Sequence, residues 1–294
     1  MIYICIPVHN RIEYTLKCIE SIEKQNYKDY KIIICDDNST DGTSKILAEK
    51  YPNVIVVKGD GNFWWTGGTN MCVKEALKTA DENDFIFTLN NDTELLNDTL
   101  MKLIEFLKEN DNCIVGAVNL FYNEPNKIEP SAFVHKQKKI FFKKLLYRLN
   151  AFGELLNNRQ GIVEVETLSG KGVLIPVKVF KKIGLYNQEK LPHYHADCEF
   201  ILRARRSGFR VFISYDAKIL SHQELSGMGT ATSKPSIRNF IKSFFNLKSA
   251  NHLKSLFNYS KFKYGSNYLI YFIIDLLRII GGFFRRYTRY LIGK

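Results

Sequence analysis

The sequence predicts an α/β fold in which a sheet is flanked by helices and followed by a basic helical tail. Over the first 120 residues, strand-like runs of β-branched residues alternate with longer segments of helical period, as in sheets with crossover helices. The chain has 294 residues and is 45% hydrophobic, which can supply the core of one large domain and an appendage. Positive charge is concentrated in residues 234–294.

Strands and helices are expected to alternate in the first half of the chain. Strand-like runs occur at Ile2–Val8, Tyr30–Cys35, Val54–Val57, Asp84–Leu89 and Cys113–Val118. Between these runs apolar residues repeat with helical spacing, as at Leu16, Ile19 and Ile22. Polar or glycine-rich segments follow several of the strands. Because ligands of open α/β sheets bind beyond the carboxyl ends of the strands, we expect these segments to converge on one crevice.

The second half of the chain is less regular. Residues 121–165 lose the alternation and are rich in lysine, asparagine and phenylalanine, which indicates an irregular or hairpin insertion. Regular elements return at Val163–Leu168, Gly172–Ile175, the helix-like Ala196–Ser207 and the strand-like Phe209–Ser214.

The cysteines and the N-terminus both favour a cytoplasmic protein. The six cysteines are scattered, form no CxxC pair, and several lie within apolar runs, as buried free thiols do. The chain begins directly with the strand-like run MIYICIPV and lacks the basic region and cleavage site of a signal peptide. We therefore expect the mature protein to begin near Met1.

An acidic pair ends the second predicted strand. Asp36 and Asp37 lie at this point, and a polar run from Asn38 to Thr43 leads into a helix. Such a pair can accept hydrogen bonds from a nucleotide base or a ribose hydroxyl. Alternatively, Asp36 makes a turn and Asp41 caps the next helix. The residues alone leave both interpretations open.

A second polar motif, Asn90-Asn91-Asp92, follows the strand-like run that ends at Leu89. A carboxylate beside a diphosphate suits a hard cation such as Mg²⁺ or Mn²⁺, which prefers carboxylate and phosphate oxygens. One aspartate is too few to hold a metal tightly without help from the substrate. A capped turn is the alternative interpretation.

The loop from Gly59 to Asn70 contains both tryptophans of the chain, Trp64 and Trp65, followed by paired glycines that open a helix. Glycine lets the backbone approach a ligand closely, and a helix N-terminus favours phosphate. The alternative is that at least one tryptophan anchors the core.

Two further segments carry candidate residues. Ser169-Gly170-Lys171-Gly172 precedes an apolar strand and is also compatible with a plain tight turn. In the helix-like segment that follows, Asp197 and Glu199 are two residues apart, so both cannot face one point. Glu199 has the helical spacing for an ion pair with Arg203. We therefore expect the two carboxylates to have different roles.

Taken together, the order and spacing of these motifs resemble the family 2 glycosyltransferases. Pro7-Val8-His9-Asn10 after the first strand, the acidic run from Asp36, and Asn90-Asn91-Asp92 carry the resemblance, which covers residues 2–225. The resemblance implies a GT-A fold with a mixed sheet, a nucleotide-sugar donor, inversion at the anomeric carbon and a divalent metal. Its rhamnosyltransferase-like branch is the one that this sequence is most similar to.

The resemblance also implies roles for individual residues. Asp37 matches the acid that binds the base, and Asp92 matches the metal-contacting acid, although Asn90 replaces the first aspartate of the DXD pattern. Asp197 matches the general base, and Glu199 and Arg203 are expected to be structural. The nucleotide-sugar is expected to contact Pro7, His9, Asn10, Trp65, Gly67, Gly68, Asn70, Asn90, Asn91 and Gly172.

His222 follows a second strand-like run in this region, Ala217–Leu220. A lone histidine is normally a satisfied structural residue, but relatives place one here to ligate the metal or contact the diphosphate, so both roles stay open.

The C-terminal tail, residues 234–294, differs from the rest of the chain in charge and in aromatic content. Residues 234–294 carry seven lysines and five arginines against the single Asp275, together with fourteen aromatic residues, whereas residues 1–233 are nearly neutral. The apolar stretch 269–280 is too short and too interrupted by charge for an ordinary spanning helix. An amphipathic helix lying on an anionic membrane fits better. Packing on the catalytic body or on a sister subunit is the alternative, and nucleic acid is disfavoured because the body is neutral.

The sequence therefore predicts a catalytic domain over residues 1–233 and a membrane-associating region over 234–294. The expected activity is transfer of a sugar from a nucleotide diphosphate to a hydroxyl of a surface glycan or lipid-linked acceptor, at the inner face of the cell membrane. One alternative is a sugar nucleotidyltransferase, which would carry a basic glycine-rich loop where this chain has Pro7-Val8-His9-Asn10. Another is a membrane-tethered nucleotide-sugar-binding protein without transferase activity.

Overall fold

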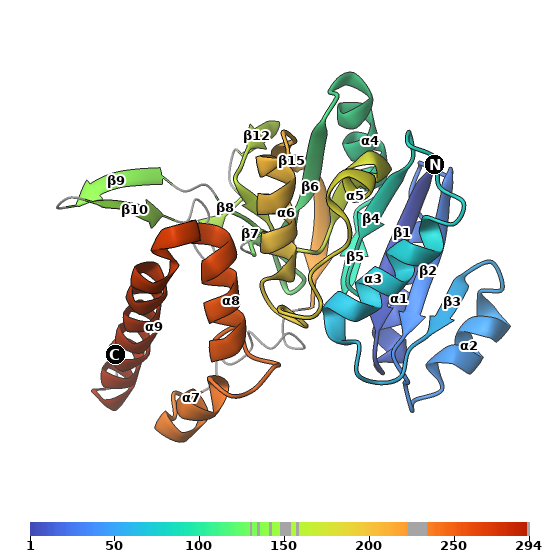
Figure 1. The fold of residues 1–294 in the computed structure, drawn as a ribbon. Coiled ribbons are helices and arrows are strands. Elements are labelled where there is room, and N and C mark those ends of the chain that lie inside the picture. Colours follow the sequence, from blue (N-terminus) through green and yellow to red (C-terminus); the bar gives the residue numbers. More distant parts are fainter. Residues whose placement is uncertain are drawn as a thin grey trace.

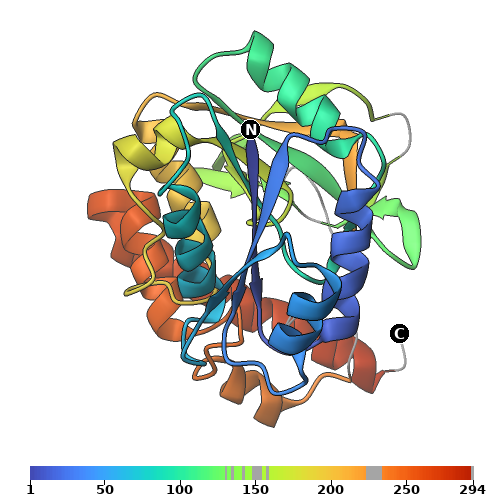
Figure 2. The same ribbon diagram turned by 90° about the vertical axis from the view of Figure 1, so that its right-hand side faces the viewer.

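The computed structural model describes residues 1–129, 131–133, 136–140, 143–147, 154–156, 159–222 and 234–292. A mixed sheet forms the centre of the molecule, with helices on both of its sides (Figures 1 and 2). The C-terminal helices lie beside this body (Figure 1). The expected α/β fold with a helical C-terminal region is confirmed.

Parallel strands and crossover helices make up the first half of the sheet. The strands run in the order β4 (Phe85–Thr88), β1 (Ile2–Val8), β2 (Tyr30–Asp36) and β3 (Ile55–Lys58). The helices between them are α1 (Ile12–Glu23), α2 (Thr43–Lys50) and α3 (Trp64–Ala76). These elements agree with the predicted runs to within a few residues at each end.

Antiparallel strands make the sheet mixed in its second half. After the short β5 (Thr93–Leu95), helix α4 (Thr99–Glu109) leads into β6 (Cys113–Phe121). Strand β14 (Val173–Pro176) is antiparallel to both β4 and β6. Strand β15 (Arg210–Ser221) is parallel to β6, with a register shift between Ser214 and Lys218. The two short strands expected in this region are thus one long, irregular strand.

Among the residues that the structure describes between β6 and β14, the regular elements are short strands. They are β7 (Glu124–Ile128), β8 (Ala132–Phe133), β9 (Lys136–Ile140), β10 (Lys143–Tyr147), β11 (Glu154–Leu155), β12 (Ile162–Glu164) and β13 (Thr167–Leu168). β9 and β10 form an antiparallel hairpin, which projects from the body in Figure 1. β7 and β11 extend the edge of the main sheet.

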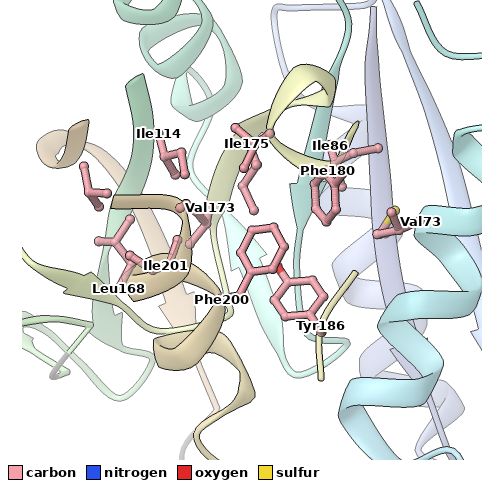
Figure 3. Close-up of a cluster of buried hydrophobic side chains, with 14 of the residues drawn as sticks. Val73, Ile86, Ile114, Leu168, Val173, Ile175, Phe180, Tyr186, Phe200 and Ile201 are labelled. Carbon is pink, nitrogen blue, oxygen red and sulfur yellow. The ribbon is translucent and has the colours of Figure 1, made fainter. Parts of the chain in front are cut away.

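Two apolar clusters cover the two faces of the sheet. Successive residues of β1 point to opposite faces, so Tyr3 and Cys5 belong to one cluster and Ile4 and Ile6 to the other. The first cluster also contains side chains of α3, α5 (Val177–Ile183) and α6 (Ala196–Arg206), and the second contains those of α1, α2 and α4. Figure 3 shows the first cluster, in which the rings of Tyr186 and Phe200 stack with centroids 4.3 Å apart.

The C-terminal region is helical and packs on the body. It contains α7 (Ile237–Ser243), α8 (Leu253–Tyr264), a short 3-10 turn at Gly265–Asn267, and α9 (Tyr268–Leu291). Helix α9 packs along α8, and α8 in turn packs against α6 (Figure 1). The region therefore shares an interface with the body that contains the mixed sheet.

The length of α9 corrects one expectation. Within the described part of the chain, the segment Leu253–Leu291 is long and apolar enough to cross a membrane by length and composition. The apolar stretch at 269–280 is only the first half of a 24-residue helix. At about 1.5 Å per residue, such a helix exceeds the thickness of the hydrocarbon core, so length alone does not exclude a span.

Candidate active site

The candidate site lies where the carboxyl ends of several strands meet the amino ends of helices α3 and α6. In the sheet, Val8 at the end of β1 lies beside Asp36 of β2, and Cys5 lies beside Thr88 at the end of β4. The loops after these three strands therefore start from one edge of the sheet. This arrangement agrees with the expected convergence of the polar segments.

Asp36 closes the turn after β2. Its Oδ1 accepts a hydrogen bond from the backbone N–H of Ser39 at 3.0 Å, and its Oδ2 accepts one from the Ser44 hydroxyl. The residue is 4% exposed. Asp36 therefore makes the turn that the sequence offered as one of two interpretations.

Asp37 holds the tryptophan loop. Its Oδ1 accepts a hydrogen bond from the N–H of Gly61 at 2.8 Å. Its Oδ2 accepts from the N–H groups of Phe63 at 2.9 Å and Trp64 at 3.2 Å. Both oxygens of this buried carboxylate are therefore engaged by the backbone of one loop. The loop-holding role was not foreseen from the sequence, and the base contact that the resemblance implies for Asp37 stays a prediction.

Replacing Asp37 with asparagine should therefore destabilise the protein as well as weaken nucleotide binding. The amide keeps one acceptor oxygen and turns its NH₂ group toward backbone N–H donors, at a cost of about 1–3 kcal/mol in the free energy of unfolding. Denaturant unfolding and calorimetry measure the two effects. Asp60→Asn is the matched control, because Asp60 accepts an N–H bond from Asn62 in the same loop at an exposed position. Unchanged stability with lost nucleotide binding would contradict the loop-holding role.

The loop after β1 is tied to the acidic loop. Nδ1 of His9 donates to the backbone oxygen of Asp37 at 2.7 Å. Asn10 donates its backbone N–H to the Ser39 hydroxyl at 2.7 Å, and its Oδ1 accepts from the N–H of Thr40 at 2.8 Å. These contacts fix the relative positions of the two loops.

The two tryptophans have different environments. Trp64 has φ of 55°, a left-handed conformation that is strained for a bulky residue and that the bond from its N–H to Asp37 helps to hold. Trp65 donates its Nε1–H to Oδ1 of Asn90 at 2.8 Å, and its ring meets the edge of the Tyr186 ring. Trp65 thus packs on the core and also contacts the polar motif after β4.

Three residues predicted to contact the nucleotide-sugar, Gly67, Gly68 and Asn70, are buried in helix α3. A Cβ on Gly68 would lie 2.9 Å from Cβ of Pro7, and one on Gly67 would lie 3.0 Å from Cβ of Phe63. Both glycines therefore allow close packing of α3. Asn70 bonds through its amide to the backbone of Tyr186 and is 2% exposed. These contacts are structural, and contact of the three residues with a nucleotide-sugar stays a prediction.

The motif after β4 contains a carboxylate oxygen suited to a cation. Asp92 is 6% exposed, and within the described part of the chain its buried Oδ1 has no hydrogen-bond partner. The side-chain amide of the preceding residue, Asn91, donates a hydrogen bond to the Thr15 hydroxyl at 3.0 Å. An unpaired buried acceptor costs free energy that a bound cation would offset. The oxygen of Asp92 is therefore compatible with Mg²⁺ or Mn²⁺.

The described residues contain no group of three or more Cys, His, Asp or Glu side chains that could hold a metal ion. A hard cation bound at Asp92 would therefore need further oxygens from a diphosphate or from water.

His222 lies next to Asp92, but its ring is engaged elsewhere. Its backbone N–H donates to the backbone oxygen of Asp92 at 2.9 Å. Its Nε2 lies 2.8 Å from Oε1 of Glu94, and its ring stacks on Tyr122 with centroids 3.9 Å apart. A metal bound at Nε2 would compete with Glu94. These contacts agree with a structural role for His222, and its role as a metal ligand stays a prediction.

Asp197 lies in the first turn of α6. Its Oδ2 accepts the N–H of Gly170 at 2.9 Å, and its Oδ1 accepts that of Cys198 at 2.8 Å. A Cβ on Gly170 would lie 2.3 Å from the Trp65 ring and 3.1 Å from Cβ of Asp197. Because Trp65 also bonds Asn90, a continuous series of contacts joins the motif that contains Asp92 to Asp197.

Gly172 and Glu199 have structural positions. Gly172 has φ of 76° at the start of β14, and a Cβ there would lie 2.8 Å from the Ile219 side chain. Glu199 is 2% exposed and pairs with Arg203 through bonds of 2.9 and 3.1 Å. Arg203 also donates to the backbone oxygen of Leu185 at 2.8 Å. The expected pair therefore forms, and it fastens α6 to the segment after α5.

Two neighbours of the site had no role assigned to them from the sequence. One is Tyr194: burial raises the pKa of its hydroxyl, and the charges of Asp197 and then Asp92 raise that pKa further. Its only sequence signal is its position just before Asp197. The second neighbour is the buried ion pair of Lys171 and Glu129, 2.7 Å apart. Glu129 lies in the irregular region, where no pattern indicated it.

Comparisons with known proteins identify relatives. A model described as glycosyl transferase family 2 matches residues 3–184, more than half of the chain. The GalNAc(5)-diNAcBac-PP-undecaprenol beta-1,3-glucosyltransferase of Campylobacter jejuni is 26% identical over 239 residues, which are 75% of this chain and 74% of that protein. The poly(ribitol-phosphate) beta-glucosyltransferase of Bacillus spizizenii is 33% identical over 118 residues, or 38% of this chain and only 18% of that protein.

Solved structures show the same fold. GalNAc-T7, crystallised with UDP, GalNAc and Mn²⁺, superimposes with a TM-score of 0.66 and 12% identity, over 92% of this chain and 49% of that one. Residues 1–349 of TarS from S. aureus superimpose with a TM-score of 0.58 and 14% identity, over 100% of this chain and 92% of that one. These matches confirm the expected GT-A-type fold.

Proposed function

Because the chain belongs to glycosyl transferase family 2, we propose that it is an inverting glycosyltransferase that uses a nucleotide-diphosphate sugar and a divalent cation, Mg²⁺ or Mn²⁺. One observation carries this function: the series of contacts through Asn90, Trp65 and Gly170 that joins the motif of Asp92 to Asp197. A carboxylate suited to a cation and a carboxylate suited to a base are thereby held in one site.

Each carboxylate has one task in this reaction. The acceptor oxygen forms a bond to the anomeric carbon as the bond from that carbon to the diphosphate oxygen breaks, with the two oxygens in line. Asp197 takes the proton of the acceptor hydroxyl. A cation held by Asp92 supplies charge neutralisation for the leaving diphosphate. Asp37 shapes the loop beside the nucleotide through its three backbone bonds.

The acceptor is proposed to be a hydroxyl of a surface glycan or of a lipid-linked glycan. The names of two relatives support this class, since one acts on a PP-undecaprenol-linked glycan and the other on poly(ribitol phosphate). Both acceptors are polyhydroxylated and carry phosphate groups. The chain spans only 18% of the length of the Bacillus protein.

Residues 1–233 are proposed to be the catalytic body and residues 234–294 a region that binds the inner face of the cell membrane from the cytoplasm. The exposed apolar side chains of α9 and the concentration of lysine and arginine in this region support membrane binding over nucleic-acid binding. Co-sedimentation with anionic vesicles measures this binding.

Nucleoside diphosphates test the function. We expect one of UDP, dTDP or GDP to raise the unfolding temperature, and to do so mainly when Mn²⁺ is present. At a concentration of 100 times Kd, the stabilisation should be about 2.7 kcal/mol. Release of that diphosphate from its nucleotide-sugar then measures turnover. No stabilisation by any of the three would contradict the donor class, and formation of a nucleotide-sugar from a nucleoside triphosphate would indicate a nucleotidyltransferase.

A further inference from the structure

The C-terminal helices contact the end of α6 that carries Asp197. His195, at the N-terminal end of this helix, stacks on Tyr259 of α8 with ring centroids 4.9 Å apart and an angle of 11° between the ring planes. Nε2 of His195 also lies 3.1 Å from the backbone oxygen of Ala250, in the segment before α8. His195, two positions before Asp197, is thus held both by α8 and by the segment before α8.

Tyr259 also interacts with Cys198, the residue that follows Asp197 in the sequence. Its hydroxyl interacts with the thiol of Cys198, whose backbone N–H donates to Oδ1 of Asp197 at 2.8 Å. Burial raises the pKa of Tyr259 well above its ordinary value, with further contributions from Cys198 and Asp197. One aromatic side chain of α8 therefore contacts the residues on both sides of the proposed base.

Two more bonds fix α8 along this interface. Nδ2 of Asn258 donates to the backbone oxygen of Lys190 at 3.0 Å. Arg206, at the C-terminal end of α6, donates to the backbone oxygen of Lys263 at 3.1 Å. Because these contacts lie near opposite ends of the interface, a displacement of α8 would also displace the first turn of α6.

Helix α9 has an inner and an outer face. On the inner face, Phe272 meets the edge of Phe257 from α8, and Phe283 stacks on Phe240 from α7 with centroids 4.0 Å apart. Helical spacing places another set of apolar side chains on the opposite face. These are Leu269, Ile270, Ile273, Ile274, Leu277 and Phe284, which are 37–63% exposed. Arg278, Arg285 and Arg289 lie along one side of this outer face.

An anionic lipid surface complements the outer face of α9. Its apolar side chains can enter the acyl boundary while the arginines meet lipid phosphates. An orientation across the bilayer is disfavoured, since α9 packs along α8, which carries Lys254, Lys261 and Lys263 and itself contacts α6. A spanning α9 would draw these charges toward the hydrocarbon core. The packing of α9 on α8 therefore favours an orientation of α9 in the plane of the membrane surface over one across the bilayer.

We propose that Tyr259 is a positioning residue through which docking of the outer face of α9 on anionic lipid sets the placement of Asp197. This coupling rests on the proposed transferase function and adds its regulation. Lipid binding holds α9 and α8, and the contacts of Tyr259 with His195 and Cys198 transmit that restraint to the first turn of α6. An anionic bilayer thus favours the arrangement in which Asp197 is positioned to act as the general base.

Donor hydrolysis, in which water replaces the acceptor, tests the coupling with the full chain. Vesicles of phosphatidylglycerol and phosphatidylcholine are compared with vesicles of phosphatidylcholine alone. Anionic vesicles should raise kcat of the wild type on the order of tenfold, a typical coupling between two sites, with little change in donor KM. Tyr259→Ala should still bind the vesicles and the donor, but its kcat should be low and insensitive to lipid.

Three further variants separate positioning from general damage. Tyr259→Phe keeps the ring that stacks on His195 and should retain most of the stimulation. Phe257→Ala removes an aromatic that packs on α9, and it should keep the basal rate. Leu277→Glu changes a side chain that is 63% exposed, and it should lose vesicle binding and stimulation while keeping the basal rate.

The possible outcomes distinguish a failure of the proposed lipid coupling from a failure of the proposed transferase function. If Tyr259→Ala is stimulated as strongly as the wild type, the coupling is overturned, while hydrolysis by the wild type still supports the transferase. If the wild type ignores anionic vesicles and forms a dimer that Leu277→Glu dissociates, the outer face of α9 binds a second copy instead of lipid. If the wild type hydrolyses no nucleotide-sugar under any condition, the proposed function itself fails.

Discussion

Asp197→Asn should lower the turnover of sugar transfer by about 10²–10⁴-fold, the usual cost of removing a general base, and should leave donor affinity nearly unchanged. An amide cannot accept the proton of the acceptor hydroxyl. Its oxygen can still accept the N–H bond of Gly170, so the first turn of α6 should keep its geometry. Steady-state kinetics with the acceptor and calorimetry with the donor measure the two quantities.

Glu199→Gln is the matched control for Asp197→Asn, because it also replaces a carboxylate of α6 by an amide. The neutral side chain loses the charge-assisted bonds to Arg203, so the free energy of unfolding should fall by about 1.5–3 kcal/mol with turnover mostly retained in the folded fraction. If Asp197→Asn keeps wild-type transfer while Glu199→Gln is folded and inactive, the roles of the two residues must be exchanged.

Asp92→Ala should abolish Mn²⁺-dependent binding of the nucleoside diphosphate. Loss of the electrostatic stabilisation of the leaving group should cost about 10²–10³-fold in turnover. The same change should not destabilise the protein without metal, because it removes a buried oxygen that has no partner among the described residues. Thermal unfolding of both proteins, with and without Mn²⁺ and nucleotide, measures these effects.

A fall in the stability of metal-free Asp92→Ala would show that the carboxylate serves the fold instead of a cation. His222→Ala separates the two candidate ligands. If it loses Mn²⁺-dependent binding while Asp92→Ala keeps it, the metal contact belongs to His222, and the bond of its ring to Glu94 must open in the loaded protein.

The sequence by itself determined the elements of the sheet and the loops at its carboxyl edge. Strand β1 has the predicted bounds, Ile2–Val8, because a buried parallel strand needs a continuous apolar run that is visible in one dimension. The pair of Glu199 and Arg203 was also predictable, since helical spacing alone brings the two side chains together.

Only the tertiary structure decided which side chains face the crevice. The bonds of Asp37 join it to residues 24–27 positions away, and Asn70 bonds to Tyr186, 116 positions away. Tyr259 meets His195 across an interface between two helices. A polar side chain can make hydrogen bonds within the folded chain or bind a ligand. The local sequence around it is the same in both cases. The choice depends on which donors and acceptors the folded chain brings within hydrogen-bond distance, and no local pattern records those distances.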